Sequence, residues 1–116
     1  MHSLWDQFPG RNDTYRRAHN LALTYTDNPM FARLGMDAAE SLDESFWLDE
    51  SHELAKTAAH ADEVLTALRT MEATGSPIAE VELTEQYLKE GGRIAERRLV
   101  QAGYRLAAVL RTIVAR

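Results

Sequence analysis

One continuous helical pattern occupies residues 84–115 and constrains the fold more than any other feature of the sequence. Apolar residues recur every three to five positions between residues 84 and 115, at Ile94, Leu99, Ala102, Leu106, Leu110 and Ile113. An unbroken helix there would be roughly 48 Å long at ~1.5 Å per residue, which is long for a chain of this size. Gly91-Gly92 is therefore predicted to bend or break the helix. Gly103, beside the apolar face, is predicted to let another helix come close.

The rest of the sequence is also helical in pattern, and no run alternates between apolar and polar residues as a half-buried strand would. Asp13 is predicted to cap a helix over residues 14–26. Asn28 and Pro29 form a second start signal, with Asn as the cap and Pro at the first helical position, and Gly35 is predicted to end that helix. These signals favour an all-α fold.

Three further boundaries complete this prediction. Ser41 to Glu44 has the Ser-x-x-Glu pattern of a capping box, so a helix is expected over residues 42–60. On that helix one face is predicted to carry Trp47, Leu54, Ala55 and Ala58. Asp62 is predicted to cap a helix that runs to Met71, residues 73–81 to form a loop, and Thr84 to cap the last helix. We expect a single helical domain over residues 1–116.

Composition excludes several classes of protein. A length of 116 residues fits one domain. The absence of cysteine excludes disulfides, thiolate zinc sites and a cysteine nucleophile. No apolar run is long enough to span a membrane, and residues 1–30 carry charge throughout, so neither a membrane span nor a signal peptide is expected.

The charge is unevenly distributed along a chain whose formal net charge is −5. Residues 37–53 carry seven acidic residues and no basic one, whereas residues 91–116 carry six arginines and one acidic residue, Glu96. The favoured interpretation is that the two stretches are solvated helix faces that attract each other. The alternative is that the arginines bind a phosphate backbone.

His2 and Asp6 are the candidate metal ligands. Residues four apart share one face of a helix, so an imidazole and a carboxylate placed this way can ligate one zinc ion. Considered in isolation, such a terminal pair is more often solvated or hydrogen-bonded. His19, His52 and His60 are interpreted as surface or packing residues, because Arg16, Arg17 or Lys56 lies near each of them on its helix.

Four segments together resemble a known family. They are His2-Ser3-Leu4-Trp5-Asp6, Trp47-Leu48-Asp49-Glu50-Ser51, Tyr87-Leu88, and the stretch from Glu96 to Ala107 that contains Ala102-Gly103-Tyr104-Arg105-Leu106-Ala107. In this order and spacing they resemble the S1/P1 family of zinc-dependent nucleases. The resemblance covers residues 2–116 and corresponds to the C-terminal half of the helical fold shared by phospholipase C and P1 nuclease.

The resemblance implies a function and a set of site residues. Family members are mostly secreted or periplasmic, cleave single-stranded DNA and RNA, and remove 3′-phosphates from nucleotides with the help of three zinc ions. By this resemblance His2 and Asp6 match two ligands of one zinc ion, and Trp5 matches the tryptophan of the same motif. The matches expected to be structural are Trp47, Glu50, Gly103 and Arg105. No side chain of this chain is expected to be the nucleophile.

The sequence also departs from the family pattern. Met1 stands where the family has Leu, and the other ligands of the family lie upstream of this position. We therefore expect the chain to be inactive on its own, with single-stranded nucleic acid or nucleotides as possible partners of a completed site and with no membrane partner. One alternative is half of a split nuclease completed by an upstream segment. The other is a non-catalytic scaffold that self-associates through exposed apolar residues such as Trp5, Phe8, Phe31 and Trp47.

Overall fold

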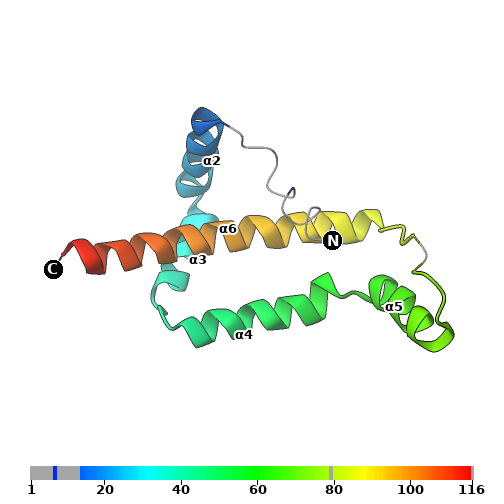
Figure 1. Ribbon diagram of the computed structural model, residues 1–116. Helices are drawn as coiled ribbons and strands as arrows, with labels where there is room; N and C mark the ends of the chain where they lie inside the picture. The colour runs from blue at the N-terminus through cyan, green and yellow to red at the C-terminus, as the bar shows by residue number, and fades with distance from the viewer. Residues whose placement is uncertain (1–6, 8–13, 79, 116) are drawn as a thin grey trace. The chain divides into compact units, whose positions relative to one another are not determined.

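The computed structural model describes residue 7 and residues 14–78 and 80–115, and within them the fold is all-α, as predicted (Figure 1). No strand occurs among these residues. None of their helices combines the length and the apolarity needed to cross a bilayer. The elements are α2 (Tyr15–Asp27), α3 (Pro29–Ala39), α4 (Glu44–Leu54), the π-helical turn η1 (Ala55–Ala59), α5 (Asp62–Thr74) and α6 (Glu85–Val114).

The chain divides into two compact units, and charge divides with them. The first unit consists of Met1–Asp43 and Gly92–Arg116, and the second of Glu44–Gly91. The second unit carries eleven acidic and three basic residues, a net charge of −8, whereas the first carries seven acidic and ten basic residues, a net charge of +3. The single domain expected over residues 1–116 stays a prediction.

Side chains cap the first two described helices. The Thr14 hydroxyl accepts a hydrogen bond from the Arg17 amide at 3.4 Å, so the cap of α2 is Thr14, one residue after the predicted Asp13. The Asn28 side-chain oxygen accepts from the Met30 amide at 3.0 Å, and Pro29 occupies the first turn of α3. The predicted start of α3 is therefore confirmed.

Gly35 has a different role from the one predicted. α3 does not end there but continues to Ala39, and Gly35 is buried in its interior. A Cβ atom built on Gly35 would overlap the ring of Tyr104, which lies on α6. The glycine is therefore needed because α3 approaches the Tyr104 ring closely, and not because the helix stops.

The glycines of α6 also differ from expectation. The sequence predicts a bend or a break at Gly91-Gly92. Residues 85–114 form one helix, so α6 does not break there, although the boundary between the two units lies between these residues. A Cβ atom on Gly92 would meet no described atom within 4 Å. The same is true of Gly103, so no other described helix comes close there, contrary to the prediction.

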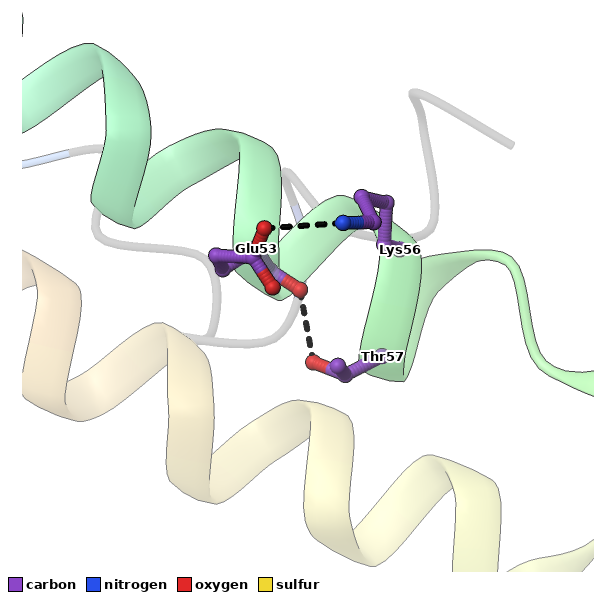
Figure 2. Close-up of polar contacts among 3 residues, drawn as sticks. All are labelled: Glu53, Lys56 and Thr57. Carbon is purple, nitrogen blue, oxygen red and sulfur yellow. Dashed lines mark hydrogen bonds and ion pairs between the residues drawn. The ribbon is translucent and has the colours of Figure 1, made fainter.

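In the second unit, α4 changes into a π-helical turn. The predicted helix over residues 42–60 begins at Glu44 and is regular only to Leu54. The His60 amide then donates to the Ala55 carbonyl at 2.9 Å, five residues back, which is the π-helical pattern. At the junction the Thr57 hydroxyl donates to the Glu53 carbonyl at 2.7 Å, and Lys56 pairs with the Glu53 carboxylate at 2.9 Å (Figure 2).

The predicted apolar face of this segment is confirmed, because its four members are all half-buried: Trp47, Leu54, Ala55 and Ala58. Glu53, on another side, is exposed, and the hydrogen bond from Lys56 lowers the pKa of its carboxyl group. The helix therefore shields an apolar side and leaves a charged side in water.

The remaining boundaries are partly as predicted. Ala61, not Asp62, occupies the cap position of α5 and makes no side-chain cap hydrogen bond. α5 continues three residues beyond Met71 and ends at Gly75, whose φ of 68° is left-handed and favours glycine. The Thr84 hydroxyl accepts from the Tyr87 amide at 3.1 Å, which confirms the predicted cap of α6.

The apolar stripe of α6 is largely exposed in the first unit. The exposed fractions are 43% for Leu99, 59% for Leu106, 49% for Leu110 and 61% for Ile113. The buried residues of the same segment are Val100 and Arg105, each 5% exposed. Helical periodicity identified the apolar stripe. However, α6 packs on α3 through another side, which carries Tyr104 and Arg105.

We predict that Gly35→Ala lowers the free energy of unfolding by about 1–3 kcal/mol, because the new methyl group overlaps the Tyr104 ring. Thermal unfolding followed by circular dichroism measures this change. Gly92→Ala is the control and should raise stability by up to ~1 kcal/mol, since alanine is the better helix former and the position is open. Equal effects of the two substitutions would contradict this account.

Candidate functional site

A buried arginine fastens α3 to α6 in the first unit. The Arg105 Nε donates a hydrogen bond to the Ala38 carbonyl at 3.2 Å, and the side chain is only 5% exposed. Ala38 lies in the last turn of α3, where carbonyl groups have no partner within the helix and carry the negative end of its dipole. A cation is therefore well placed there, and this contact supports the structural role that the resemblance implies for Arg105.

Tyr25 links α2 to the neighbouring helices. Its hydroxyl donates to the Glu96 carboxylate on α6 at 3.4 Å, and its ring packs edge-on against Phe31 of α3, with ring centres 5.1 Å apart. Burial, and to a lesser extent the Glu96 charge, raise the pKa of the Tyr25 phenol above its ordinary value. Tyr25 therefore stays protonated at neutral pH and serves as a hydrogen-bond donor.

An apolar pocket opens between α2 and α6, with a volume of about 750 Å³. This volume is within the range of small-molecule and side-chain binding sites. Its wall is made mostly of small and aliphatic side chains, with a cation on the lining, and includes Ala18, Leu21, Ala22, Leu99, Ala107 and Arg111. The pocket can bind an apolar group, and the described residues that line it include no carboxylate or histidine for acid–base catalysis.

The second unit is held by a buried tyrosine. Tyr87, 9% exposed, donates from its hydroxyl to the Ala59 carbonyl at 3.0 Å. The contact joins the first turn of α6 to the end of η1. Trp47 and Glu50 of α4 are half-buried in the same unit. Tyr87, which belongs to one of the segments that resemble the family, therefore links two elements of the second unit.

The candidate metal ligands His2 and Asp6 lie outside the described residues, as do Trp5 and Phe8. Within the described residues, no group of three or more histidine, aspartate and glutamate side chains is placed to hold a metal ion. A zinc site needs at least three protein ligands. The described residues therefore do not fit a zinc ion by themselves.

The other histidines occupy exposed positions. His19 is exposed and stacks on Tyr15, with ring centres 5.8 Å apart. His52 and His60 are also exposed. These positions agree with their interpretation as surface residues.

Sequence patterns did not reveal the contact of Gly35 with Tyr104 or that of Arg105 with Ala38. Both join residues of α3 and α6 that are more than 60 positions apart in the sequence, and periodicity carries no information on such pairs. One feature of the sequence points to the second contact: Arg105 is a charged residue that lies directly beside the apolar stripe of α6. Phe31, expected to be exposed, is half-buried against Tyr25.

We predict that Arg105→Met destabilises the protein by about 1–3 kcal/mol, because the Ala38 carbonyl loses its buried donor. Chemical denaturation measures the change. Arg97→Met is the matched control on the same helix, where the side chain is exposed and the effect should stay within about 0.5 kcal/mol. If both substitutions prove neutral, the hydrogen bond does not hold α3.

Comparison with known proteins adds one finding. A family model described as S1/P1 Nuclease matches residues 1–115, nearly the whole chain. No curated protein and no solved structure gives a significant match. The family match thus includes His2 and Asp6 as well as both compact units.

Proposed function

Because the chain belongs to the S1/P1 nuclease family, we propose that it takes part in the metal-dependent hydrolysis of phosphodiester bonds in single-stranded DNA or RNA, and of 3′-phosphates of nucleotides. The observation that carries this proposal is the family match over residues 1–115, which contains the His2-to-Asp6 motif. Nuclease-like hydrolysis is the activity that family membership indicates.

His2 and Asp6 are the proposed zinc ligands of this chain. An imidazole nitrogen and a carboxylate oxygen are both ordinary zinc ligands, but two are fewer than the three that a catalytic site requires. Among the described residues no group of three such side chains is placed to hold a metal ion. We therefore propose that further ligands come from outside this sequence, and that the chain is inactive by itself. No hydrolytic step is assigned to any of its side chains.

The charge of the first unit supports a nucleic-acid substrate. This unit carries a net charge of +3, although the whole chain carries −5. His2 and Asp6 belong to the same unit by their position in the sequence. Several of its arginines are exposed, among them Arg16, Arg93 and Arg97. A polyanion is attracted to such a surface, and the attraction weakens as salt is added.

We predict weak zinc binding that depends on the proposed ligands. Isothermal titration of the chain with zinc should give one site, and His2→Ala or Asp6→Ala should weaken it by about tenfold or more, because removal of either ligand leaves one protein donor. His52→Ala is the control, since His52 is exposed on α4 and outside the motif. Unchanged zinc affinity in both ligand variants would contradict the assignment of His2 and Asp6.

Cleavage is tested by complementation. A polypeptide that carries the missing His and Asp ligands should restore cleavage of single-stranded DNA when mixed with the chain, and a chelator should abolish it. If the chain binds zinc but cleavage is not restored, the assignment of the metal site stands and the proposed activity is wrong.

A second prediction concerns single-stranded DNA itself. Replacing Arg93 and Arg97 together by glutamine should weaken binding and reduce the slope of log affinity against log salt by roughly 1.4, about 0.7 for each phosphate that an arginine no longer neutralises. Fluorescence anisotropy of a labelled oligonucleotide over a salt series measures this slope. The double control replaces Lys56 and Arg69, two exposed basic residues of the second unit that lie outside α6, by glutamine. Because both variants change the net charge equally, a similar loss in both would exclude a specific role for α6.

A further inference from the structure

Two adjacent glycines, Gly91 and Gly92, lie inside α6 where the two compact units meet along the chain. A glycine is usually needed where the backbone has a positive φ or where another group comes close. Among the described glycines only Gly75 has a positive φ, and a Cβ atom on Gly92 would meet no described atom within 4 Å. Neither backbone conformation nor packing therefore explains the glycine at position 92.

α6 is anchored separately on the two sides of this glycine pair. Before it, the Tyr87 hydroxyl donates to the end of η1 at 3.0 Å, within the second unit. After it, Glu96 accepts from Tyr25 at 3.4 Å and Arg105 donates to the Ala38 carbonyl at 3.2 Å, within the first unit. Each part of α6 therefore keeps its own contacts when the helix opens between them.

The second connection between the units is not helical. The first unit passes to the second between Asp43 and Glu44, and residues 41–43, just before α4, belong to no helix. The chain returns to the first unit between the two glycines of α6. Both covalent connections therefore lie at short segments that can absorb a change of φ and ψ, as hinges do.

The glycine pair is the intrinsically weakest part of α6. Glycine is the poorest helix former after proline, because it loses the most conformational freedom in a helix. Small-residue pairs of this kind are among the usual sites of sharp helix kinks. Across the pair, the amides of residues 92–95 donate to the carbonyls four residues back, so these hydrogen bonds join the two parts of α6.

We propose that the glycine pair is a hinge, at which α6 opens transiently so that the two units change their orientation relative to each other. The opening breaks the hydrogen bonds of the amides of residues 92–95, and residues 41–43 provide the second flexible connection. Both units stay folded, because the contacts that hold each of them lie on one side of the pair. The hinge is independent of the proposed nuclease function.

Distances between spin labels test this motion, since the chain has no cysteine of its own. Labels at Met36→Cys on α3 and Leu48→Cys on α4 occupy exposed positions in different units. Double electron–electron resonance should give a broad distance distribution for this pair. Met36→Cys with Leu110→Cys, two exposed positions of the first unit, should give a narrow one. Equally narrow distributions for both pairs would overturn the proposal.

Two alanine variants test whether the glycine pair controls the motion. Gly92 and Gly103 both lie in α6 at positions open to a methyl group, but only Gly92 is at the boundary between the units. Gly92→Ala should lower the open fraction about fivefold, the factor that corresponds to ~1 kcal/mol of helix propensity, and so narrow the distribution between the units. Gly103→Ala should leave this distribution unchanged. The same result for both variants places the hinge elsewhere and overturns the proposal.

Amide hydrogen exchange tests how the hinge opens. In the unsubstituted chain the amides of residues 92–95 should have protection factors at least about tenfold lower than those of residues 100–105, which lie where α6 packs on α3. Gly92→Ala should raise the protection of residues 92–95 about fivefold, as it lowers the open fraction. Equal protection of the two segments in the unsubstituted chain would show that α6 does not open at the glycine pair, and would overturn the hinge.

Discussion

The close packing of α3 on α6 is the constraint on which the rest of the first unit depends. Gly35 allows the approach because it has no side chain to collide with the Tyr104 ring. Arg105 then reaches the Ala38 carbonyl and satisfies the end of α3. Because these contacts occupy one side of α6, they determine which side remains exposed. The exposed apolar stripe is thus a consequence of the α3 contact.

Charge and structure divide the chain at the same point. The acidic second unit is organised around Tyr87, whose hydroxyl binds the end of the π-helical turn. The basic first unit contains the motif of His2 and Asp6 by sequence and the exposed arginines of α6 by structure. The net positive charge therefore belongs to the unit whose sequence contains the family motif, and positive charge attracts polyanions.

Much of the fold could be predicted from local sequence, because local chemistry decides it. Asn28 with Pro29, and Thr84, start helices where their side chains can accept backbone amides, and the structure has these caps. Glycine was the least predictable residue type. Gly35 was expected to end a helix and Gly91-Gly92 to break one, but a glycine without left-handed φ is tolerated inside a helix when the rest of it is well supported. The candidate metal site could be predicted only as the His2-to-Asp6 motif. A complete site needs ligands from distant segments, and local sequence does not show which segments come together.

The sequence by itself determined the helical class, the starts of α3 and α6, the uneven charge and the family, because each of these depends on residue types and their spacing along the chain. Tertiary structure decided which side of each helix is covered. Periodicity identified an apolar stripe on α6, but a buried arginine and a buried glycine placed the α3 contact on a different side. That choice depends on pairs of residues far apart in the sequence, such as Ala38 with Arg105, and only their packing in space reveals it.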